Sequence, residues 1–69
     1  MKISARNTLK GKIVAVEKGA TTAHVKIEIA DGTVVTASIT NDSVDALGLT
    51  VGGEAYAVVK SSDVMIAVD

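Results

Sequence analysis

The chain has 69 residues, 48% of them apolar, and a formal net charge of −1 at pH 7. Because it has no cysteine, disulfides and cysteine-based metal sites are excluded, and the charge argues against a nucleic-acid partner. No apolar run approaches the roughly 18 residues that cross a bilayer, and the N-terminus lacks the apolar stretch of a signal peptide. We therefore expect one domain, residues 1–69, in the cytoplasm and away from membranes.

The composition also predicts a homo-oligomer. A domain of this length buries only about 60% of its unfolded surface, so a single core is marginal. Small domains usually compensate with disulfides, metals or large aromatic side chains, but Tyr56 is the only aromatic residue here. The many small aliphatic residues then need another place to be buried, and we expect subunits that bury them against one another.

Three strands are expected in the N-terminal half. Residues 9–17 contain an unbroken apolar run, which predicts a strand buried on both faces. After a turn, residues 23–29 alternate between apolar and polar side chains, as in a strand with one buried face. Asp31 and Gly32 predict a hairpin turn, because glycine accepts a positive φ, and residues 34–39 predict a third, β-branched strand.

A short helix and two further strands are expected in the C-terminal half. Thr40 or Asn41 can cap a helix that ends at Gly48, a residue suited to the left-handed position after the last turn. Residues 54–59 predict a fourth strand, and residues 64–68, apolar on both faces, predict a fifth. An all-β fold with five strands and a helix between the third and fourth is the layout of an OB-type barrel.

A short polar motif lies near each end of the chain. The motifs are Ser4-Ala5-Arg6-Asn7 and Lys60-Ser61-Ser62-Asp63. Each combines a cation with hydroxyl and backbone N–H donors, which is the donor set that an oxyanion requires. If the fold or an assembly brings the two motifs together, they form a small anion site. With one histidine and no carboxylates that spacing forces together, an enzyme is not expected.

Three segments of the chain carry a resemblance to a known family. They are Ile3-Ser4-Ala5-Arg6-Asn7-x-Leu9-x-Gly11, Val44-x-x-Leu47-Gly48-Leu49 and Lys60-Ser61-Ser62-Asp63-Val64-Met65. They resemble molbindin, the Mop family of small molybdate-binding proteins, whose module is a TOBE-type domain. The resemblance covers essentially the whole chain. It implies a five-stranded barrel and a cytoplasmic homohexamer, a trimer of dimers, that stores molybdate or sometimes tungstate between subunits.

The resemblance also implies which residues contact the oxyanion. The family's contact residues match Ser4, Ala5, Arg6, Lys60 and Ser61. A second class of oxyanion site in the family relies on main-chain groups, and the corresponding stretch is Lys18, Gly19, Ala20, Thr21 and Thr22. Molybdate is a dianion with four acceptor oxygens, so either site must offer donors only.

The sequence is also compatible with two other functions. An OB-type nucleic-acid-binding module would share the fold, but it needs aromatic stacking platforms and a basic groove, and this chain has one tyrosine and a negative net charge. A molybdate-responsive interaction or regulatory scaffold would use the same anion site as its signal, and the sequence does not separate this role from storage.

Overall fold

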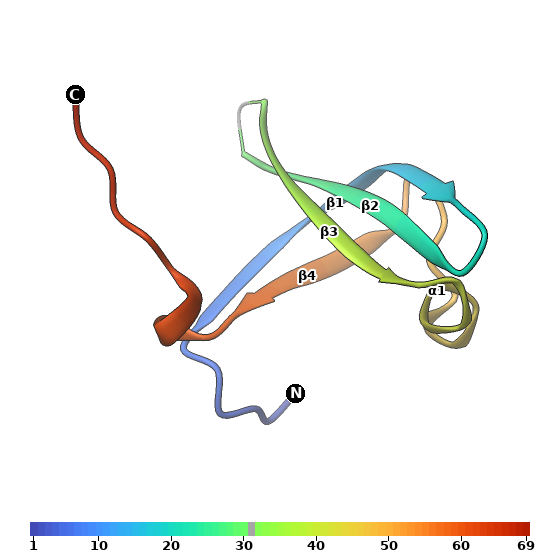
Figure 1. Cartoon of the computed structure of the whole chain (residues 1–69), viewed down its shortest axis with the longest axis horizontal. Helices are drawn as coiled ribbons and strands as arrows, with labels where there is room; N and C mark the ends of the chain where they lie inside the picture. Colours follow the sequence, from blue (N-terminus) through green and yellow to red (C-terminus); the bar gives the residue numbers. More distant parts are fainter. Residues whose placement is uncertain (31) are drawn as a thin grey trace.

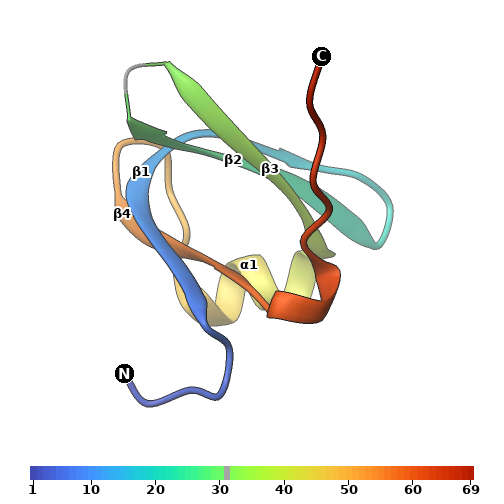
Figure 2. The ribbon, with the colours of Figure 1, turned by 90° about the vertical axis from the view of Figure 1, so that its left-hand side faces the viewer.

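The computed structural model describes residues 1–30 and 32–69. Its elements are β1 (Asn7–Lys18), β2 (Thr22–Ala30), β3 (Thr33–Thr40), helix α1 (Asn41–Leu47), β4 (Glu54–Val59) and the short 3₁₀ turn η1 (Ser61–Asp63). The strands form one antiparallel sheet in the order β3-β2-β1-β4, which curls into a half-barrel (Figure 1 and Figure 2). The predicted all-β class and the helix between the third and fourth strands are confirmed.

The curl of the sheet depends on β1, the longest strand, which pairs with two partners. Its first half pairs with β4 and its second half with β2. The β1–β2 register shifts between Ile13 and Ala15, and an irregularity of this kind bends a strand. Just before the bend, a Cβ at Gly11 would lie 2.5 Å from the carbonyl oxygen of Glu28. The close crossing of β1 and β2 at this point therefore requires glycine.

The core is small and lies inside the curl. Among the described residues, the buried hydrophobic side chains are Ile13, Ala23, Val25, Ile27, Val44 and Ala57. Three of them come from alternate positions of β2, as its period-two pattern predicts. Helix α1 contributes Val44, so the helix covers part of the interior of the half-barrel.

Helix α1 begins and ends where the sequence predicts. Thr40 is the N-cap, and its Oγ1 accepts a hydrogen bond from the backbone N–H of Ser43 at 3.0 Å. Gly48 follows the last turn with a φ of 63° and donates its N–H to the carbonyl oxygen of Asp45. Both ends thus satisfy backbone groups that a helix of this length would otherwise leave unpaired.

The tight turns also use glycine in the left-handed region. Gly32 has a φ of 84° and Gly52 a φ of 93°, values that side chains with a Cβ rarely adopt. The predicted turn residue Asp31 lies outside the described residues.

The predicted fifth strand is wrong for a single subunit. Residues 64–68 pair with no strand in the described part of the chain, and they run away from the half-barrel to the C-terminus (Figure 1 and Figure 2). Met65, Ile66 and Val68 are 92%, 87% and 91% exposed. The apolar pattern of this segment predicts a strand that is buried on both faces. The pattern is the same whether the strand joins the sheet of its own subunit or that of another subunit. The observed sheet accordingly has four strands.

Candidate functional site

The two end motifs meet at one end of the β1–β4 pair. Asn7, the first residue of β1, is paired with Val59, the last residue of β4. Asn7 Nδ2 also donates to the Val59 carbonyl oxygen at 3.1 Å. Arg6 immediately precedes this pair and Lys60 immediately follows it, so antiparallel pairing places both motifs at the same corner of the sheet (Figure 2).

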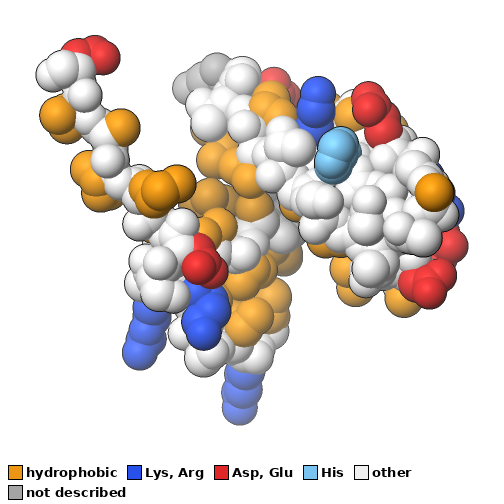
Figure 3. Space-filling model, viewed as in Figure 1, with side chains coloured by type: hydrophobic (Ala, Val, Ile, Leu, Met, Phe, Trp, Pro, Cys, Tyr) orange, Lys and Arg blue, Asp and Glu red, His pale blue; other side chains and the backbone are white. Residues whose placement is uncertain are grey.

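Among the described residues, the cations of this corner have no acidic partner. In the part of the chain that the structure describes, the ion pairs are Lys10–Glu54 and Lys18–Asp45, and neither involves Arg6 or Lys60. Ser4, Arg6, Lys60 and Ser61 are exposed, and Ala5 is half-buried. Figure 3 shows Lys and Arg side chains projecting from the end of the molecule where the chain begins. A single subunit therefore offers these donors to solvent.

The 3₁₀ turn after β4 engages two carbonyl oxygens of the same corner in hydrogen bonds within the turn. The N–H of Asp63 donates to the Lys60 carbonyl oxygen at 2.9 Å, and the N–H of Val64 donates to the Ser61 carbonyl oxygen at 3.3 Å. Both carbonyl oxygens are thus occupied within the turn. The groups left for a ligand are mainly the ammonium and hydroxyl donors, together with the carboxylate of Asp63, which would repel an anion.

The second predicted stretch, residues 18–22, lies at the other end of β1. All of its residues are exposed. Its only cation is already engaged, because Lys18 Nζ lies 2.6 Å from Asp45 Oδ1. Since β1 spans 12 residues at about 3.3 Å each, one subunit does not bring this stretch and the end motifs together.

An apolar groove lies on the open side of the half-barrel, a feature that sequence reasoning missed. It has a volume of about 350 Å³. Its lining residues come from β2, β3, β4 and the end of α1: Val25, Ile27, Val35, Thr36, Ala37, Ile39, Leu47, Leu49, Tyr56, Ala57, Val58 and Val59. The groove exists because β3 and β4 are the two outer strands of the sheet and do not pair with each other.

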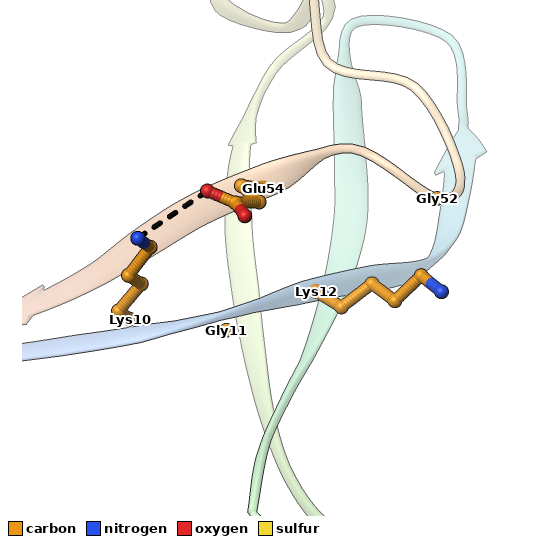
Figure 4. A pocket seen from close by; sticks show the side chains of 5 residues that line it. All are labelled: Lys10, Gly11, Lys12, Gly52 and Glu54. Carbon is orange, nitrogen blue, oxygen red and sulfur yellow. Dashed lines mark ion pairs between the residues drawn. The ribbon is translucent and has the colours of Figure 1, made fainter.

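A second depression, of about 420 Å³, lies on the outer surface of β1 and β4. Lys10 and Glu54 form an ion pair of 3.4 Å across it, and Lys12 points away from that pair (Figure 4). The side chains here do not converge on a common point. Lys10 and Lys12 are both exposed to solvent.

Two further classes of site find no support in the described residues. No three His, Cys, Asp or Glu side chains lie close enough together there to hold a metal ion. No helix in that part of the chain has the length and apolar character needed to span a bilayer.

The contacts of Asn41 and Asp45 with residues 18–22 were not predicted, because no spacing rule links residues so far apart in the sequence.

The comparisons with known proteins agree on one family. The TOBE domain matches residues 3–66. Molybdenum-pterin-binding protein 3 of Clostridium pasteurianum is 59% identical over 66 residues, which cover 96% of this chain and 97% of the relative. The structure of MopII from Clostridium pasteurianum is similar with a TM-score of 0.90 and 55% identity, covering 97% of this chain and 100% of that one.

A third comparison is with ModG, described as a cytoplasmic molybdate-binding protein and solved with molybdate bound. Its TM-score is 0.90 at 40% identity, over 94% of this chain and 46% of the ModG chain. Molybdenum-pterin-binding protein 3 and ModG are both named as binding proteins rather than as enzymes, in agreement with the sequence-based expectation. The chain belongs to the TOBE-domain family and, within it, to the Mop group of small molybdenum-pterin-binding proteins.

Proposed function

We propose that this protein binds molybdate or tungstate as a cytoplasmic store, in sites completed between the subunits of a homo-oligomer. The observation that carries the proposal is the Asn7–Val59 pair, which places Arg6 and Lys60 at one corner of the sheet. Neither cation has a carboxylate partner in the described chain. The names of the relatives, one of them solved with molybdate bound, support this choice of ligand.

The donors at this corner match the chemistry of the ligand. Arg6 supplies a planar fork of N–H donors and Lys60 a compact ammonium. The hydroxyls of Ser4 and Ser61 can rotate to donate, and the small side chain of Ala5 lets an oxygen approach the backbone N–H. Two positive charges balance the two negative charges of molybdate, so that the complex can be buried without a large net charge.

A partner subunit is needed because these donors are exposed in one chain. The C-terminal segment 64–68 presents exposed apolar side chains and lies outside its own half-barrel. The groove between β3 and β4 is apolar and has two outer strands whose edges are free to pair. The exchange of this segment between two subunits would supply the fifth strand of each barrel and cover both apolar surfaces.

This exchange would also bring a second chain to the oxyanion site. Lys60 and Ser61 lie directly before the exchanged segment, at η1, where the chain would leave one half-barrel for the other. The residues that surround the bound anion would then come from more than one subunit. A dimer built in this way is the repeating unit that a trimer of dimers requires.

Isothermal titration calorimetry with molybdate, tungstate and sulfate tests the ligand. We expect heat with the first two and a marked loss of affinity in Arg6→Ala, because the anion loses its forked donor. Lys12→Ala is a matched control, since Lys12 is an exposed cation of β1 outside both motifs. An absence of heat with all three anions would overturn the proposed function, and equal losses in the two variants would overturn the role of Arg6.

A further inference from the structure

Met65 lies in the segment that its own half-barrel leaves uncovered, and the oxyanion site does not use it. Its side chain is 92% exposed, the highest value among the large hydrophobic side chains of the described residues. Figure 3 shows the hydrophobic side chains of this C-terminal tail standing clear of the rest of the molecule. In a single subunit the thioether of Met65 is therefore accessible to small molecules in solution.

Residues 64–68 carry no polar side chain. In an extended segment alternate side chains point to opposite faces, so Met65 and Ala67 form one apolar face and three branched residues form the other. Such a pattern suits burial on both faces, and methionine suits a packed interface because its unbranched side chain adapts to irregular surfaces. Any polar group introduced at Met65 would have to be desolvated when the segment is buried.

The thioether is the one group of this segment that an oxidant readily converts from apolar to polar. With hydrogen peroxide, a sulfur lone pair attacks one peroxide oxygen, a sulfur–oxygen bond forms and the oxygen–oxygen bond breaks. The sulfur loses two electrons, and the hydroxide that leaves takes the proton of the transferred hydroxyl and departs as water. The product is a sulfoxide, whose oxygen is a hydrogen-bond acceptor, and burying it without a donor costs free energy.

We propose that Met65 is a peroxide-sensitive modification site that controls assembly and, with it, the release of the bound oxyanion. The sulfoxide keeps residues 64–68 from being buried against a partner, so the segment stays exposed as it is in a single subunit. The proposed anion contacts keep their own chemistry but face solvent again. This inference rests on the proposed function, because it requires that a partner buries the segment.

The second methionine of the chain is an internal reference for the reaction. Met1 is 78% exposed and lies outside residues 64–68, so assembly through that segment should not protect it. In dilute protein both methionines should react with hydrogen peroxide at similar rates, whereas in concentrated protein Met65 should become protected relative to Met1. Molybdate should increase this protection, because a ligand that binds the assembly stabilises it. Peptide mass spectrometry measures both extents of oxidation in one sample.

Two substitutions separate the polarity of the sulfoxide from the reaction that forms it. Met65→Leu keeps an apolar side chain of similar volume without a sulfur atom, and Met65→Gln imitates the polar sulfoxide. In sedimentation velocity over a dilution series, the dissociation constant of Met65→Gln should exceed that of Met65→Leu roughly 10- to 100-fold.

Treatment with hydrogen peroxide then tests the modification itself. The treated unmodified chain should dissociate like Met65→Gln and should assemble again after reduction by a methionine sulfoxide reductase. Met65→Leu should assemble equally well before and after treatment. Met1→Leu is the matched control, because it removes the other methionine and should respond to peroxide as the unmodified chain does.

Three results would overturn the inference while the proposed function stands. They are a ratio of Met65 to Met1 oxidation that does not change with protein concentration or molybdate, equal dissociation constants for Met65→Gln and Met65→Leu, and an equal loss of assembly in peroxide-treated Met65→Leu and unmodified protein. An unmodified chain that stays monomeric in the presence of molybdate, before any peroxide is added, would instead overturn the proposed intersubunit site and this inference together.

Discussion

The substitution Ile66→Ser distinguishes an isolated subunit from an exchanged pair, that is, two subunits that bury residues 64–68 in each other's groove. In one subunit Ile66 is 87% exposed, so the change should alter the free energy of unfolding of that subunit by no more than about 0.5 kcal/mol. In an exchanged pair the same side chain is buried in the partner's groove, and its loss removes about 1.5–3 kcal/mol of apolar transfer free energy. Because a two-fold interface contains the substituted residue twice, the total loss of apolar transfer free energy is about 3–6 kcal/mol.

That free energy corresponds to an increase of roughly 10² to 10⁴ in the dissociation constant of the pair. Sedimentation velocity or gel filtration with light scattering, measured over a dilution series, detects such a change directly. Val51→Ser is the control, because Val51 is 65% exposed but does not line the groove. If Ile66→Ser and the unmodified chain dissociate at the same concentration, the C-terminal segment is not buried in a partner, and the reasoning is refuted.

Three further substitutions test local features. Thr40→Ala removes the acceptor of the Ser43 N–H and should lower the free energy of unfolding in urea by about 1 kcal/mol, whereas Thr40→Ser should not. Gly11→Ala places a Cβ 2.5 Å from the Glu28 carbonyl oxygen and should cost about 1–3 kcal/mol, so an unchanged melting temperature would contradict the close strand crossing. Lys60→Ala should weaken molybdate binding and reduce its dependence on ionic strength, and an unchanged salt dependence would place the ammonium away from the anion.

The parts of the fold that depend on local chemistry could be read from the sequence. Thr40 and Gly48 mark the ends of α1 because capping is decided by neighbouring residues. The alternation of β2 predicts its buried face because one side of a curled sheet must be covered. The approach of the two end motifs follows from the antiparallel pairing of β1 with β4, but the sequence alone does not fix that register.

Features that depend on distant residues could not be read in this way. The apolar pattern of residues 64–68 indicates burial, yet it is the same whether the strand completes its own barrel or another one. Asn41 and Asp45 look like ordinary residues of a short helix, and only the folded chain brings them to Gly19 and Lys18. Such contacts depend on tertiary geometry, which local propensity and periodicity do not encode.

The magnitude of the electrostatic attraction explains why a subunit this small would need a partner in order to hold its ligand. Two unit cations about 4 Å from a dianion gain roughly 4 kcal/mol in water, where the dielectric constant is near 80, and this corresponds to a dissociation constant of roughly 1 mM. If a partner excludes water and the effective dielectric constant falls to about 20, the same charges gain roughly 16 kcal/mol before the cost of desolvating the anion is subtracted.

The exclusion of water by a partner would then contribute more to affinity than Arg6 and Lys60 could contribute in a single exposed chain. Ile66→Ser changes no proposed ligand of the anion, yet by this reasoning it should weaken molybdate binding to the same extent that it weakens assembly. Titration of this variant below and above its dissociation concentration measures the dependence. Full molybdate affinity in the dissociated subunit would show that one chain holds the anion, and the proposed intersubunit site would then have to be abandoned.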